Sequence, residues 1–148
     1  MRWIYRVIIL LCLLVCLGGC SELSNNTSTA SYISDVVTYS EGHEAFVCYF
    51  VLKDASGDET ANDGRYTLKV EDNSGVLYTR TRSVKEDGFQ RATVGRGAFE
   101  RKRLLYYVGR ITYDDFSREP EGYTGTVSVE FRLGTGRTLY GEDMLLFD

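Results

Sequence analysis

The chain of 148 residues contains few of the residues that most often carry out chemistry. It has one histidine, His43, and one proline, Pro120, and its only tryptophan is Trp3. The sequence lacks the GxSxG, HExxH and paired-cysteine metal-binding motifs, and it has no glycine-rich phosphate-binding loop. His43 lies in the turn-like segment SEGHEAF, where no neighbouring residue marks it as a catalytic base. No catalytic site is recognisable, although two carboxylates from distant segments could still form one.

Cysteine is scarce after the first twenty residues, where only Cys48 remains. The beginning of the chain has the pattern of a signal peptide, because Arg2 and Arg6 precede the apolar run VIILLCLLVCL (7–17) and two glycines. Eleven helical residues span about 16 Å, roughly half of the ~30 Å hydrocarbon core. A cleaved signal therefore fits better than a transmembrane anchor, for which an uncleaved helix extended toward the chain start is the alternative.

The segment LGGC (17–20) resembles the lipobox of prokaryotic lipoproteins. This resemblance covers about the first twenty residues and implies that a diacylglycerol is attached to the thiol of Cys20 after residues 1–19 are removed. It also implies a protein held by lipid on a cell membrane or outer membrane, facing outside the cytoplasm. Cys48 would then lack a disulfide partner, and its apolar surroundings in AFVCYFVL predict a buried, inert thiol. A Cys20–Cys48 disulfide is the alternative if lipidation fails.

The segment that follows the lipobox is polar, and the chain left after cleavage is acidic. Residues 20–31 contain SELSNNTSTAS, which predicts a flexible leash, with glycosylation sequons at Asn25 and Asn26. Loss of Arg2 and Arg6 leaves 15 basic and 21 acidic residues, a net charge of about −6. This charge argues against nucleic acid or anionic lipid as a general partner.

Long amphipathic helical repeats are missing, and residues 32–148 instead alternate apolar and polar positions between short turns. In TVSVEFRL (126–133) the valines, Phe131 and Leu133 share one face of a strand. AFVCYFVLK is apolar on both faces, which predicts a central strand. Turns are predicted at DNSG (72–75) and GTGR (134–137). Strands are predicted at 32–40, 45–53, 65–72, 76–84, 104–113, 126–133 and 137–147.

This pattern predicts an all-β fold, an antiparallel immunoglobulin-like β-sandwich of about seven strands with unknown strand order. DGRYTLKV resembles a segment of immunoglobulin-like and fibronectin-III-like extracellular domains, but only two predicted strands precede it, where the tyrosine corner needs five. The whole domain also resembles uncharacterised small domains of archaeal and bacterial surface lipoproteins, which implies no activity. Residues 89–103 fit either a short strand or one helical turn.

Three groups of residues are candidate sites. An acidic loop could bind calcium through Asp54, Asp58, Glu59 and Asp63, although it lacks EF-hand spacing and turns favour Asp for backbone reasons. A basic cluster could bind oxyanions through Arg91, Arg96, Arg101, Lys102 and Arg103, or it could be a solvated strand end. Tyr106 and Tyr107 should lie on opposite strand faces, so that one could contact a sugar or a protein.

These features favour a lipid-anchored cell-envelope protein that acts as a non-catalytic binding module. Its partner would be the membrane, through the anchor, and another envelope protein or an anionic or sugar polymer. A carboxylate- or calcium-dependent enzyme acting on surface polysaccharide is one alternative. A purely structural envelope lipoprotein is the other.

Overall fold

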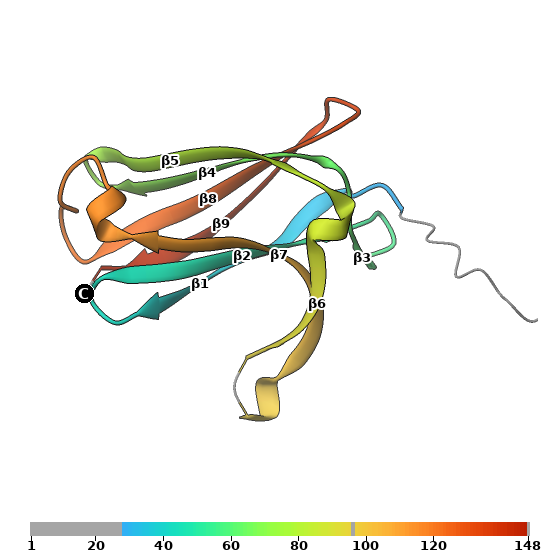
Figure 1. The fold of residues 1–148 in the computed structure, drawn as a ribbon, viewed down its shortest axis with the longest axis horizontal. Coiled ribbons are helices and arrows are strands. Elements are labelled where there is room, and N and C mark those ends of the chain that lie inside the picture. Colours follow the sequence, from blue (N-terminus) through green and yellow to red (C-terminus); the bar gives the residue numbers. More distant parts are fainter. Residues whose placement is uncertain (1–27, 96, 148) are drawn as a thin grey trace, which may run out of the picture.

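The computed structural model describes residues 28–95 and 97–147 (Figure 1). The predicted signal peptide, Cys20 and most of the leash lie outside the described residues. No helix in the described part of the chain is long and apolar enough to cross a membrane. The elements are β1 (Tyr32–Glu41), β2 (Ala45–Lys53), β3 (Glu59–Thr60), β4 (Gly64–Asp72), β5 (Gly75–Val84), η1 (Glu86–Gly88), β6 (Phe89–Val94), η2 (Gly97–Phe99), β7 (Arg101–Thr112), η3 (Tyr113–Asp115), β8 (Thr124–Leu133) and β9 (Thr138–Leu146).

The strands form two antiparallel sheets that pack face to face, which confirms the predicted all-β sandwich (Figure 1). The first sheet has the order β1-β2-β7-β6, with β3 paired to the end of β2, and the second has the order β5-β4-β8-β9. If β3 is set aside and the other strands are lettered A, B, C, C′, D, E, F and G along the chain, the sheets read ABED and C′CFG. This is the strand order of immunoglobulin-like sandwiches.

Aromatic side chains fill the centre of the core between the sheets. The ring centroid of Phe50 on β2 lies 5.4–6.1 Å from those of Tyr66, Phe89, Tyr106 and Phe131. Phe50, Tyr66 and Phe131 belong to the B, C and F strands, on which immunoglobulin domains have their disulfide and buried tryptophan. Here aromatic packing between the same three strands replaces that covalent link.

Cys48 is the free cysteine of the described residues, and its side chain is fully buried in the core. Burial raises the pKa of its thiol to about 12. The thiol is therefore protonated at neutral pH, and only the thiolate is an effective nucleophile. The predicted burial of Cys48 is confirmed.

The strand predictions differ from the structure mainly between residues 84 and 104. This region contains β6, the short 3₁₀ helix η2 and the first residues of β7, so both a strand and a helical turn are present. β3 was not predicted, and the described residues contain nine strands. Tyr66, from the DGRYTLKV segment, lies on the C strand and points into the core, so it does not form a tyrosine corner.

We expect Phe50→Ala to lower the free energy of unfolding by about 3–5 kcal/mol, because it leaves a cavity at the centre of the aromatic cluster. Urea unfolding followed by circular dichroism measures this loss. Tyr140→Ala is the control, since Tyr140 is exposed, and it should change stability by less than about 0.5 kcal/mol. Equal effects of the two substitutions would contradict the assigned role of Phe50.

Candidate binding face

The outer face of the first sheet has an apolar cluster of its own, separate from the core. Tyr49 and Val51 of β2 and Leu105 of β7 point away from the second sheet, yet they are 6%, 0% and 5% exposed. The partly buried side chains of Val37, Ala92 and Val94 pack around them. This cluster explains why β2 is apolar on both faces.

Two exposed tyrosines extend this cluster to the surface. The strand register places Val37 opposite Tyr49 and Tyr49 opposite Tyr107, which makes a row across β1, β2 and β7. Tyr107 is 54% exposed, and Tyr39, whose ring centroid lies 6.0 Å from that of Tyr49, is 41% exposed. We call this surface the tyrosine face. It comprises Val37, Tyr39, Tyr49, Val51, Ala92, Val94, Leu105 and Tyr107.

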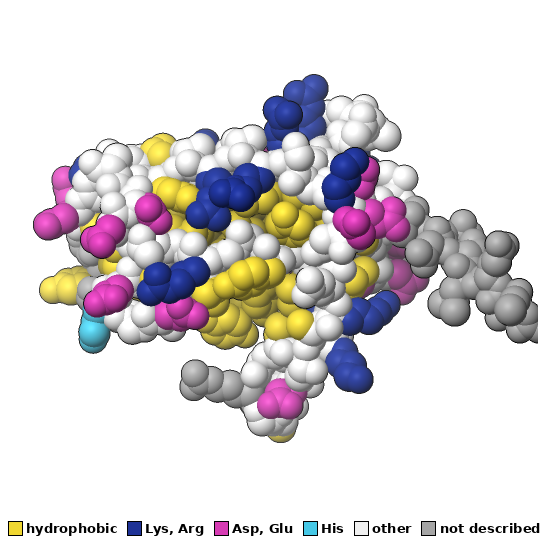
Figure 2. Space-filling view, viewed as in Figure 1, with side chains coloured by type: hydrophobic (Ala, Val, Ile, Leu, Met, Phe, Trp, Pro, Cys, Tyr) yellow, Lys and Arg dark blue, Asp and Glu magenta, His cyan; other side chains and the backbone are white. Residues whose placement is uncertain are grey.

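The tyrosine face also carries phenol hydroxyl groups. The oxygens of Tyr39 and Tyr49 lie 3.5 Å apart. Burial, followed by the contact with Tyr39, raises the pKa of Tyr49 well above its usual range. Figure 2 shows hydrophobic side chains exposed in the corner where the β6–β7 hairpin turns away from the sandwich. The face therefore combines apolar surface with phenol groups that can donate a hydrogen bond.

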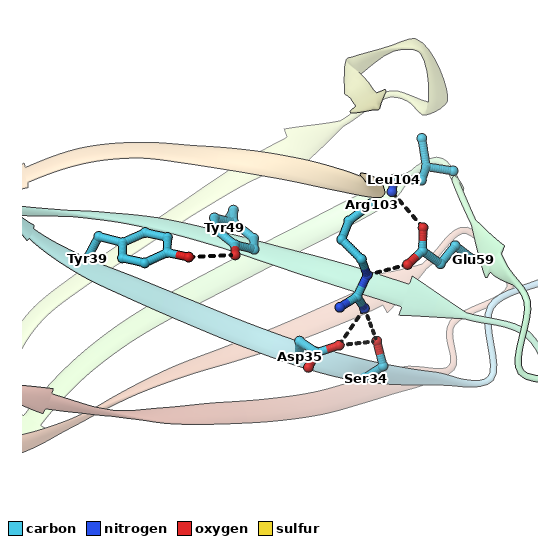
Figure 3. A network of polar contacts seen from close by, with 7 residues as sticks. All are labelled: Ser34, Asp35, Tyr39, Tyr49, Glu59, Arg103 and Leu104. Carbon is cyan, nitrogen blue, oxygen red and sulfur yellow. Dashed lines mark hydrogen bonds and ion pairs between the residues drawn. The ribbon is translucent and has the colours of Figure 1, made fainter. Parts of the chain in front are cut away.

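An ion-pair network borders one end of the tyrosine face (Figure 3). Arg103 on β7 donates to the carboxylate of Asp35 on β1 at 2.6 Å and also pairs with Glu59 on β3. Glu59 accepts a second hydrogen bond, at 2.6 Å, from the backbone N–H of Leu104. Three strands are thus tied together by one guanidinium, whose planar geometry suits two carboxylates.

The same network sets the acidity of Asp35. Burial alone would raise the pKa of Asp35, but hydrogen bonds from Arg103 and Ser34 and the charge of Arg103 outweigh it and hold the pKa below its usual value. Asp35 is therefore ionised at neutral pH and keeps its ion pair with Arg103, whose side chain is 19% exposed.

The structure separates the two tyrosines proposed from the sequence. Tyr107 lies on the outer face, whereas Tyr106 points inward and packs against Phe50 and Tyr66. Tyr107 therefore belongs to the candidate site, and Tyr106 belongs to the core. Tyr39 and Tyr49 were missed from the sequence, although the two-faced apolar pattern of AFVCYFVLK pointed to a covered outer face.

The proposed basic cluster is divided in the structure. Arg91, Arg101 and Lys102 are exposed on the β6–β7 hairpin, while Arg103 is enclosed in the network with Asp35 and Glu59. Arg96 lies outside the described residues. The exposed members form a surface of the hairpin, and Arg103 has a structural role.

The acidic loop does not bring its carboxylates together. Asp54 accepts hydrogen bonds from the backbone N–H groups of Ser56 and Asp58 at 2.9 and 3.0 Å, which closes the turn. Asp63 pairs with Lys85 at 2.9 Å, and Glu59 belongs to the Arg103 network. In residues 28–95 and 97–147 no group of three His, Cys, Asp or Glu side chains could hold a metal ion. The arrangement gives the calcium hypothesis no support.

Comparison of the chain with known protein families, with curated proteins and with solved structures finds no match.

We expect Arg103→Met to flatten the dependence of stability on pH in the acid range. Asp35 has a lower pKa in the folded than in the unfolded chain, so its contribution is present above the unfolded pKa of about 3.9 and is lost as pH falls through the folded pKa. Lowering the pH from about 5 to about 2 should therefore reduce the urea concentration at half-unfolding by less in Arg103→Met than in the parent. The variant should also be less stable than the parent at neutral pH.

Arg110→Met is the matched control for this measurement. It removes the exposed pair between Arg110 and Glu41, whose side chains are 47% and 48% exposed. Exposed pairs contribute little, so both the neutral stability and the acid slope should stay close to those of the parent. An Arg103→Met profile parallel to that of the parent would refute the assignment.

Proposed function

We propose that the protein is a lipid-anchored cell-envelope protein whose β-sandwich is a non-catalytic binding module. In this proposal the partner, another envelope protein, binds the tyrosine face. The observation that supports it most is an exposed aromatic surface next to a buried apolar cluster that the core does not require.

The second sheet provides the comparison that makes this surface unusual. A sandwich must bury only one face of each sheet, and the central strands of the second sheet, β4 and β8, have a polar outer face, with Lys69 opposite Ser128 and Thr67 opposite Glu130. The exposed Tyr140, Met144 and Leu146 of that sheet lie on its edge strand β9. The outer face of the first sheet instead has Val37, Tyr49 and Tyr107 in one row. Tyrosines bury a large area at a small cost in conformational entropy, and they are enriched in protein interfaces.

The proposed location rests on the sequence. The start of the chain has the order of a lipoprotein signal peptide, with basic residues first, then the eleven-residue apolar run and then LGGC. Cys20 precedes Ser28, the first described residue, by only eight residues. A fully extended chain of that length reaches roughly 28 Å, so the sandwich would stay close to its membrane. One acyl chain gives marginal binding, and two or more give stable anchoring.

A photo-crosslinking amino acid at position 107 should give a discrete protein adduct in intact envelopes, because the side chain would face the partner. The same substitution at position 140 is the control, since Tyr107 and Tyr140 are 54% and 56% exposed but belong to different sheets. Gel electrophoresis and mass spectrometry measure the adducts. Equal labelling at both positions, or none at 107, would argue against the tyrosine face as the binding surface.

Mass spectrometry of the mature N-terminus should find Cys20 as the first residue, with a diacylglyceryl group on its sulfur. Cys20→Ser should shift the protein from the lipid-anchored fraction, because the thioether can no longer form. A processed chain with an unmodified Cys20, or a chain that retains residues 1–19, would contradict the proposed lipid anchor.

A further inference from the structure

The β6–β7 hairpin has an excess of positive charge that the described part of the chain does not neutralise. Arg91, Arg101 and Lys102 are exposed, and none of them belongs to an ion pair within the described residues. Glu100 is the only acidic residue between Phe89 and Arg103. This excess contrasts with the net charge of −4 of the whole chain.

The pairing of β6 with β7 places like charges next to each other. Arg91 lies opposite Leu104 and Thr93 lies opposite Lys102, so Arg91 and Lys102 are diagonal neighbours on one face of the hairpin. Diagonal neighbours in an antiparallel pair are about 7–8 Å apart, and like charges on neighbouring strands repel. An external anion would remove this repulsion.

The tip of the same hairpin presents an aromatic ring to solvent. Phe99 ends η2 and is 79% exposed, although a phenylalanine is usually buried. A Cβ atom at Gly95, which has a φ of +105°, would lie 2.5 Å from the carbonyl oxygen of Phe99. Glycine at position 95 therefore permits the close backbone approach that shapes the tip. In Figure 1 the hairpin projects away from both sheets.

We propose that the tip of the β6–β7 hairpin docks on an anionic lipid bilayer, with Phe99 in the headgroup region. Arg91, Arg101 and Lys102 then contact the lipid phosphates. An apolar side chain next to several basic residues is a combination that binds membrane interfaces. The apolar side chain buries its surface in the interface, and the basic residues are attracted to anionic lipids. An acidic protein surface would also match the charges, and it is one of the outcomes of the test below.

The proposed anchor would bring the hairpin within reach of the membrane, and to this extent the inference rests on the proposed function. The eight residues from Cys20 to Ser28 extend to roughly 28 Å, whereas the six residues of β6 span about 20 Å. The leash is thus long enough for the tip to touch the bilayer that holds Cys20. The tether and the hairpin would then fix the orientation of the sandwich together.

Phe99→Trp tests the docking, because the wild-type chain has its only tryptophan at Trp3, within the predicted signal peptide. The full chain, purified from the membrane of a host that processes lipoproteins, is reconstituted in vesicles of phosphatidylcholine alone or of equimolar phosphatidylcholine and phosphatidylglycerol. Tryptophan emission and quenching by brominated lipid are measured, with the parent chain as background. We expect emission from position 99 to shift to the blue, with quenching, most strongly in the anionic vesicles.

Two further variants define the contributions to docking. Replacing Arg91, Arg101 and Lys102 by glutamine should weaken docking. The ratio of chains whose position 99 is in the bilayer to chains whose position 99 is in water should fall roughly fivefold for each residue replaced. Tyr123→Trp is the matched control, since Tyr123 is 84% exposed on a different loop, and its emission should stay that of tryptophan in water. Matching circular dichroism melts establish that the variants are folded.

Flotation of the vesicles separates failure of this inference from failure of the anchor. Chains that float with both vesicle types while position 99 remains in water overturn the docking and leave the anchor standing. Chains that float only with anionic vesicles, with a blue shift at position 99, support the docking and overturn the anchor. A shift produced by polyglutamate but not by vesicles overturns the docking in favour of an acidic protein partner.

Discussion

Packing of aromatic rings between the two sheets determines which residues of the first sheet face outward. Phe50 lies at the centre of that packing, and its neighbours come from β4, β6, β7 and β8. Because side chains alternate along a strand, fixing Phe50 inward also fixes Tyr49 and Val51 outward on β2. The tyrosine face therefore depends on the core in a direct geometric way. A slip of one residue in the pairing of β2 would exchange the two faces.

The first sheet supports two surfaces of different character. Across β1, β2 and β7 it is apolar and aromatic, and the network of Arg103 with Asp35 and Glu59 borders this area. Along the β6–β7 hairpin it becomes basic and ends at Phe99. Arg103 lies where the two areas meet, and by pairing with carboxylates of β1 and β3 it fixes the base from which the hairpin extends. The division of the basic cluster thus has a structural cause.

Local patterns in the sequence predicted most strands, the turn at DNSG and the burial of Cys48, because period-two alternation and turn chemistry act over a few residues. The Arg103 network could not be predicted in this way, since it joins residues that are 44 and 68 positions apart. The short strand β3 depends on its pairing with the end of β2. The assignment of Tyr107 rather than Tyr106 to the surface required knowledge of which face of β7 meets the second sheet.

The described residues contain no interstrand disulfide, and this has a consequence for how the domain matures. With aromatic rings on the B, C and F strands, the sandwich needs no oxidative step to reach its final form. Cys48 is held protonated and out of contact with solvent, so the folded domain offers oxidants and other thiols no thiolate from this position. The same domain can therefore mature in a reducing or an oxidising environment, and Cys48 cannot cross-link neighbouring copies as long as the sheets remain closed.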